Sequence, residues 1–143
     1  MANNPKFSTG FRDALINNDL AEMFEGGELH IYSGTQPTDA DADEGAGTLL
    51  AVIALPADEA FENTPTDGIL EKAGTWEETS APVTGTAAWF RLYDSAVTTG
   101  ASVTAVRLDG TVGTATSDLI IDSTSITSGD SVVVDTFSIT LAA

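Results

Sequence analysis

The C-terminal part of the chain is patterned as a series of short strands. Between Thr86 and Ala143, runs rich in Val, Ile, Phe and Thr are each closed by Gly, Asp or Ser, as in half-buried strands separated by tight turns. The runs are TAAWFRLYDS, ASVTAVRLDG, DLIIDSTSI and SVVVDTFSITL. We therefore expect a succession of antiparallel strands in this region.

Two of these runs carry finer predictions. TAAWFRLYD has large apolar side chains in both phases of the alternation, which is typical of a central strand covered on both faces. In the last run, residues 137–141 alternate cleanly, whereas Val132 and Val134 fall in the opposite phase. A β-bulge near Asp135 would bring both valines to the core face, and we predict one there.

The start of the chain carries the only helical pattern. Apolar residues recur at three-to-four-residue spacing over 9–25, Ser8 or Thr9 can cap the first turn, and a Gly–Gly pair follows. We predict one helix over 9–25. Residues 1–8 precede it as an extended arm, which is too polar to bury itself.

The rest of the chain, 28–143, is expected to form the β-rich body of a single domain that spans all 143 residues. The segment 28–33 alternates as a strand, and LLAVIAL reads as a strand buried on both faces or covered by the helix. Residues 34–47 read as an exposed acidic loop and 57–74 as a long loop. The expected fold is mainly β, an antiparallel β-sandwich, of which a jelly roll is one version, with one N-terminal α-helix.

Charge narrows the classes of partner. The chain has 22 Asp and Glu against 5 Lys and Arg, a formal charge of −17. Such a surface repels phosphate backbones and anionic lipid, so neither nucleic acid nor a membrane is expected as a partner. Cysteine is absent, which excludes disulfides and thiolate chemistry, and the longest apolar run is far shorter than a membrane span.

One acidic run resembles the start of a calcium loop. Asp39, Asp41 and Asp43 have the D-x-D-x-D spacing in which carboxylates converge as the chain turns. The match then fails, because Glu44 stands where the motif needs glycine and Leu50 where it needs a bidentate glutamate. We expect a solvated loop and no cofactor, with weak calcium binding as the alternative.

Catalytic patterns are weak. His30 is the only histidine and lies in a strand pattern beside Tyr32, where packing is its usual role. No serine occupies a G-x-S-x-G elbow. Carboxylate pairs such as Glu77/Glu78 and Asp118/Asp122 are expected by chance in so acidic a chain. We predict that the protein is not an enzyme.

Aromatic residues give the better candidates for a partner interface. Trp76 lies between two acidic, flexible segments, and Phe7 and Phe11 lie at the start of the chain, where large apolar groups can anchor a partner. The alternative is that they cap the core. Trp89 and Tyr93, together with Trp76, could instead stack on a sugar ring, provided that their strand face is open to solvent.

The segments STGFRDALINNDL, GGELHIYSGTQPTDADA, GTLLAVIAL, GTAAWFRLYDSAVTTGASVTAVRLDGTVG, DLIIDSTSITSGD and TFSITL together resemble small virion structural proteins of tailed bacteriophages. The closest likeness is to capsid decoration, or cement, proteins. The resemblance implies a non-enzymatic β-rich protein on the outer capsid surface of the virion, present in the host cytoplasm before assembly. It also implies that the protein clamps neighbouring subunits of the major capsid protein, often as a dimer or trimer.

The arm is the segment that we assign to that contact. Residues 2–8 precede the first capped element, so their deletion should leave the body folded and abolish binding to the shell. Two alternatives stay open. The same fold could serve as a head–tail connector or tail structural protein, or as a carbohydrate- or receptor-binding module.

Overall fold

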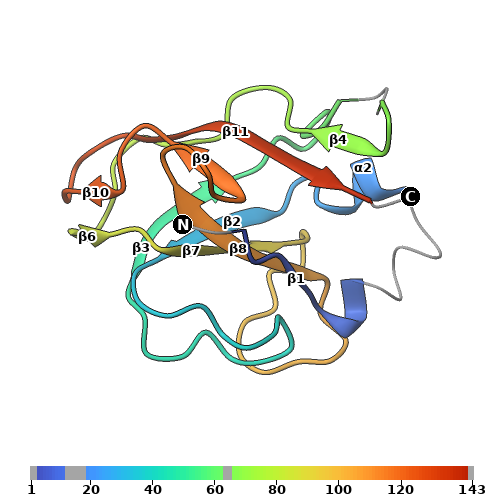
Figure 1. Cartoon of the computed structure of the whole chain (residues 1–143), viewed down its shortest axis with the longest axis horizontal. Helices are drawn as coiled ribbons and strands as arrows, with labels where there is room; N and C mark the ends of the chain where they lie inside the picture. The colour runs from blue at the N-terminus through green and yellow to red at the C-terminus, as the bar shows by residue number, and fades with distance from the viewer. Residues whose placement is uncertain (1–2, 12–18, 63–65, 142–143) are drawn as a thin grey trace.

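The computed structural model describes residues 3–11, 19–62 and 66–141. The chain is mainly β, as predicted, and short strands account for most of its regular structure (Figure 1). The strands are β1 Lys6–Phe7, β2 Glu28–Tyr32, β3 Leu49–Ala54, β4 Ile69–Glu71, β5 Glu77–Glu78, β6 Gly85–Thr86, β7 Trp89–Tyr93, β8 Arg107–Gly113, β9 Leu119–Ile121, β10 Ser125–Ile126 and β11 Val132–Thr140, and the helix α2 is Leu20–Met23.

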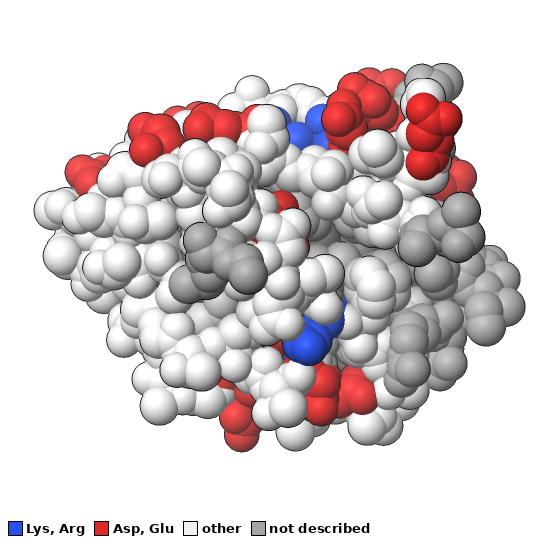
Figure 2. Space-filling view, viewed as in Figure 1, with Lys and Arg blue, Asp and Glu red and all other residues white. Residues whose placement is uncertain are grey.

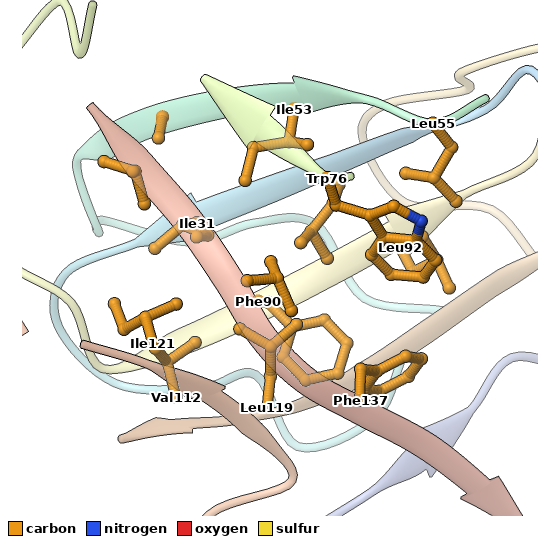
Figure 3. Packing of buried hydrophobic residues seen from close by; sticks show 14 of the residues in the cluster. Ile31, Ile53, Leu55, Trp76, Phe90, Leu92, Val112, Leu119, Ile121 and Phe137 are labelled. Atoms are coloured by element: carbon orange, nitrogen blue, oxygen red, sulfur yellow. The ribbon is translucent and has the colours of Figure 1, made fainter. Parts of the chain in front are cut away.

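One curled sheet dominates the fold. Its strand order is β3-β2-β7-β8-β9-β11-β4, with β1 added beside β8 and β5 beside β11, while β6 and β10 form a separate pair. The curl brings β11 over β7, so that Phe137 packs edge-on against Phe90 with ring centroids 5.4 Å apart. A single curled sheet therefore encloses the core where two stacked sheets were predicted (Figure 3).

The sheet is mixed, so the prediction of a purely antiparallel succession is wrong at one place. β8 and β9 run parallel, with Val112 opposite Leu119. The short connection between them turns back sharply because the Asp118 carboxylate accepts hydrogen bonds from the N–H and the hydroxyl of Thr111, at 2.9 and 3.0 Å. This local clamp lets the chain re-enter the sheet in the same direction without a long crossover.

The predicted bulge and the predicted central strand are both confirmed. The register of β11 against β9 shifts between Val134 and Thr136, at Asp135. As a result Val132 and Val134 are buried together with the apolar residues that follow the bulge. Strand β7 lies between β2 and β8, and all five of its side chains are buried.

The single helix predicted over 9–25 is wrong. Residues 9–11 are helical, and Ser8 caps them by accepting a hydrogen bond from the Phe11 N–H at 2.9 Å. Asp19 then adopts an extended conformation (φ −71°, ψ 124°) and caps the separate helix α2 by accepting from the Ala21 N–H. An aspartate that bonds the backbone in this way starts a new helix. Residues 12–18 lie outside the described part.

The extended arm predicted for residues 1–8 is largely built into the sheet. Lys6 and Phe7 pair with β8, and Ser8 is completely buried. The Ser8 hydroxyl donates to the Ala105 carbonyl at 2.7 Å and accepts from the Arg107 N–H at 3.0 Å. Deleting the arm should therefore disturb the fold, contrary to the expectation from sequence; its first two residues lie outside the described part.

Ser8→Ala should lower the free energy of unfolding by about 2 kcal/mol. The substitution leaves two buried N–H groups and one buried carbonyl without their hydroxyl partner. Chemical denaturation would measure the effect, with Asn4→Ala as the control because the Asn4 side chain bonds only at the exposed surface. Equal stability of the two variants would contradict the account.

The two predicted loops differ in outcome. Residues 34–47 contain no strand, as expected. The segment predicted as a loop over 57–74 contains β4, which pairs with the end of β11 through Leu70 and Ile139. A run of only three strand residues, flanked by polar segments, lacks the alternation that would have predicted it. Residues 63–65 lie outside the described part.

Candidate functional site

An ion pair is buried on the side of the sheet opposite the core. Arg91 of β7 and Asp109 of β8 are completely buried and face each other across the two strands. The guanidinium donates two hydrogen bonds to the carboxylate, from Nε to Oδ1 at 2.7 Å and from Nη2 to Oδ2 at 2.8 Å. Burial alone would lower the pKa of Arg91, but these hydrogen bonds and the charge of Asp109 raise it well above its usual range.

Arg107 ties two loops to the same face. Its guanidinium donates to the carbonyls of Thr98 and Gly100 in the loop after β7, and to the Ala40 carbonyl in the acidic loop 34–47. Arg91 adds a bond to the Ala42 carbonyl of that loop at 2.9 Å. The two arginines therefore hold both loops over the outer face of the sheet.

Glu44 closes this network from the acidic loop. Its carboxylate accepts from the Tyr93 hydroxyl at 2.8 Å and from the Gly100 N–H at 3.1 Å, and it lies 3.3 Å from Arg91 Nη1. Burial alone would raise the pKa of Glu44, but the hydrogen bonds from Tyr93 and backbone N–H groups, together with Arg91, lower it below its usual value. The loop predicted as solvated is thus anchored by an internal carboxylate.

The stability of the protein should fall with acid more steeply than that of a Glu44→Gln variant. The folded pKa of Glu44 is lowered, so its stabilising contribution is present above the ordinary glutamate value of about 4.3 and is lost as the pH falls toward the folded value. Urea unfolding of both proteins from pH 6 downward would measure the free energy of unfolding. Glutamine is the replacement because its side-chain oxygen can still accept hydrogen bonds from Tyr93 and Gly100 but does not titrate. Parallel curves would contradict this role of Glu44.

Two of the three predicted interface aromatics are core residues. Trp76 is completely buried, with its ring edge-on to Phe61 at 5.3 Å, and it packs inside the cluster shown in Figure 3. Phe11 is also completely buried and stacks against Phe24. Both assignments to a surface are wrong, because the curled sheet closes over side chains that the sequence places between polar segments. Phe7 remains 37% exposed.

The proposed sugar platform is excluded by burial. Trp89 and Tyr93 lie under the loops of the ionic network, and their exposed fractions are 1% and 0%. Trp89 stacks on Tyr32 with ring centroids 4.4 Å apart, and Arg107 lies over the ring of Tyr93. These faces are occupied by the protein itself, so no sugar ring can reach them.

The acidic run Asp39, Asp41 and Asp43 serves the backbone of its own loop. Asp39 accepts from the N–H groups of Asp41 and Ala42, and Asp43 from that of Gly45. These are turn-forming bonds of the kind that aspartate side chains commonly make. Asp41 instead binds the Thr9 N–H at 2.7 Å. In the part of the chain that the structure describes, no group of three or more His, Asp or Glu side chains is placed to hold a metal.

The carboxylate pairs and the histidine are not brought together into a site. Asp118 and Asp122 line different recesses. Glu77 accepts a hydrogen bond from the Ser131 hydroxyl at 2.6 Å. His30 lies 2.7 Å from Glu28 and packs its ring against Tyr93.

The surface around the end of β11 is the candidate functional site. Phe7, Ile69 and Leu141 are exposed there by 37%, 37% and 43%. Two recesses flank the strand and share Ile139: one of about 220 Å³ is also lined by Phe7, and one of about 300 Å³ by Leu141. We call this region the β11-end surface.

Charge is distributed unevenly around that surface. The face that carries β1, β9 and β11 is mostly uncharged, and its acidic residues gather toward the rims (Figure 2). Sequence reasoning found Phe7 but missed Ile69 and Leu141. Leu141 continues the apolar alternation of residues 137–141, which favours burial, but the strand ends at Thr140 and the Leu141 side chain is exposed.

Comparison with known proteins found no match for the chain among protein families, curated proteins or solved structures. Within the described residues, no helix has the length and apolar character that crossing a membrane requires.

Proposed function

We propose that the protein is a structural component of a tailed-phage particle, a decoration protein that binds the outer capsid and clamps neighbouring major capsid subunits. The observation that carries the proposal is the β11-end surface, where Phe7, Ile69 and Leu141 expose apolar side chains. The recesses beside them are also lined by acidic residues: Asp19, Glu22, Glu25 and Asp118. Exposed aromatic and aliphatic side chains are typical of the centre of a protein–protein interface.

The distribution of charge suits repeated copies on a shell. Acidic rims repel packaged DNA, while the face between them, which carries few charges, is available to bind protein. A stable single interface needs roughly 1,000 Å² or more, and repetition on a symmetric shell lets weaker contacts suffice through avidity. A dimer or trimer of the chain would raise that avidity further.

The buried network supports a structural role over catalysis. Arg91, Asp109, Arg107 and Glu44 bind one another and the loop carbonyls, so their charge is directed inward. Such a network holds two long loops in one arrangement, which a rigid particle component needs. It presents none of these groups to a substrate.

A sedimentation experiment tests the proposal. The purified chain is mixed with undecorated capsids of the phage that encodes it, and the bound copies are counted after pelleting. Leu141→Glu should reduce the bound copies by about tenfold or more, because it replaces an exposed apolar side chain with a carboxylate beside Asp19, Glu22 and Glu25. Val103→Glu is the matched control, since Val103 is 62% exposed and lines neither recess.

Three outcomes are distinct. Binding in many copies per shell that only Leu141→Glu weakens supports the decoration role. Binding of one ring of copies per particle would replace it with the head–tail connector or tail role. Absence of binding by the parent protein would overturn the particle role.

A further inference from the structure

The large sheet is interrupted beside β11. The outer edge of β8 is shared by two short strands: β1 pairs with Leu108 and Asp109, and β9 with Val112 and Gly113. β9 in turn pairs with β11 only as far as Phe137. Beyond that point β1 and the end of β11 run in similar directions (Figure 1) and line one recess, and no strand of the described part of the chain joins them.

The backbone of β1 turns unpaired groups toward this gap. The Ser8 N–H donates to the Arg107 carbonyl, and Lys6 lies opposite Asp109. Residues 6 and 8 are therefore the positions of β1 whose backbone groups face β8. In an antiparallel pair the residue between two bonded positions directs its N–H and C=O away from the partner strand. The N–H and C=O of Phe7 therefore point away from β8, toward the recess that Phe7 lines.

The backbone of β11 does the same from the other side. Leu141 N–H donates to the Gly68 carbonyl, and the Phe137 carbonyl accepts from Lys72 N–H, so the odd-numbered residues bond β4. The N–H and C=O of Thr140 consequently point away from β4, toward the same recess. Two strand edges thus face one slot.

The direction of the strands suits an inserted strand. β1 is antiparallel to β8, β8 is parallel to β9, and β9 is antiparallel to β11. β1 and β11 therefore run the same way. A segment inserted between β1 and β11 in the direction of β9 would be antiparallel to both neighbours, and antiparallel pairs are slightly more stable per residue than parallel ones.

The recess between these edges has an apolar wall and one unused hydroxyl. It holds about 220 Å³, and Leu108, Phe137 and Ile139 line it. Ser117 also lines it, and its buried Oγ has no hydrogen-bond partner among the described residues. A buried hydroxyl without a partner is costly, so a segment that supplies one would gain from this position.

Charge selects the kind of occupant. Asp118 lines the recess, where its carboxylate accepts hydrogen bonds from the N–H groups of Asn4 and Thr111. The adjoining recess, which shares Ser117 and Asp118, is lined by two further carboxylates and one ammonium group: Glu71, Asp135 and Lys72. A second copy of a chain with formal charge −17 would be repelled here. An inserted segment antiparallel to β11 would end near Asp118, where a Lys or Arg would be attracted.

We infer that the slot between β1 and β11 receives an extended strand from a different protein, with apolar side chains at alternate positions and a Lys or Arg near its C-terminal end. This is recognition by strand addition, in which main-chain hydrogen bonds give affinity and alternate side chains give specificity. The inference rests on the proposed function only in assigning that strand to the capsid.

An appended strand tests the slot directly. The full chain is extended after Ala143 by a tight turn and a strand of alternating threonine and valine that ends in lysine. A matched chain carries the same turn followed by glycine and serine and the same lysine. Amide hydrogen exchange of Phe7 and Thr140 is the readout, and both amides should be protected at least about tenfold more in the strand-bearing chain.

Thr140→Pro provides a second variant. It removes the slot-facing N–H and places the ring in the slot, while the bonds of residues 139 and 141 to β4 remain. In the strand-bearing chain it should abolish the extra protection of Phe7. In the chain without the appended strand, the Thr140→Pro variant should have nearly the same midpoint of denaturant unfolding as the parent protein. That result would show that the fold is intact.

The outcomes separate the slot from the particle role. Protected amides, together with loss of capsid binding by the strand-bearing chain only, support the inference. Unprotected amides overturn it. Protected amides with capsid binding retained overturn the slot as the capsid contact and leave the proposed function standing. If neither chain binds capsids, the proposed function fails and amide exchange alone decides whether the slot accepts a strand.

Discussion

Asp109→Ala should lower the free energy of unfolding by about 3–5 kcal/mol. The substitution removes both hydrogen bonds that Asp109 accepts from Arg91 and leaves the buried guanidinium with one carboxylate contact, Glu44 at 3.3 Å. Glu44 cannot compensate, because it contacts a different nitrogen of Arg91 and is already bonded to Tyr93. Equilibrium denaturation at neutral pH would measure the loss.

A double variant provides the control. Replacing Arg91 by methionine in the Asp109→Ala background removes the unpaired charge and keeps much of the apolar volume, so part of the stability should return. A cost below about 1 kcal/mol for Asp109→Ala alone would contradict the central place of this pair. It would mean that water or a loop rearrangement solvates Arg91.

Trp76→Ala should cost about 3–5 kcal/mol of unfolding free energy and leave binding to capsids unchanged per folded molecule. The indole is completely buried, and its centroid lies 5.8 Å from that of Phe137, so truncation opens a large cavity in the core. Differential scanning calorimetry and the pelleting assay would measure the two effects separately.

Trp76→Phe is the matched control for that prediction. Phenylalanine keeps an aromatic ring against Phe61, and the lost indole N–H has no hydrogen-bond partner among the described residues. Its cost should therefore be clearly smaller than that of alanine. Unchanged stability with lost capsid binding in Trp76→Ala would return Trp76 to the surface role that the sequence first indicated.

Local alternation predicted those parts of the fold that depend on neighbouring residues. The phase change around Asp135 predicted the bulge, because only an extra residue lets Val134 and Phe137 reach the same face. Large side chains in both phases of β7 predicted a strand covered on both sides. Each conclusion needed no information from distant segments.

Features that depend on distant segments were not predictable in this way. The curl of the sheet arises from pairings between strands far apart in sequence, such as β4 with β11. The parallel entry of β9 depends instead on the side-chain bonds between Thr111 and Asp118, which the alternation of apolar residues does not reveal. Trp76 was misassigned because its flanking segments are polar, although the curl buries it. The sequence does contain one signal for the buried ion pair. Arg91 stands in the middle of a strand predicted to be covered on both faces, and a buried arginine requires a carboxylate partner.

Electron cryomicroscopy of capsids decorated with the purified protein tests the central claim most directly. The account predicts density for this fold at symmetry-related sites across the shell, with the β11-end surface facing the capsid and a strand of a capsid subunit between β1 and β11. Bound molecules that turn the acidic rims to the shell and leave this surface in solvent would contradict the account, as would capsids that carry no such density.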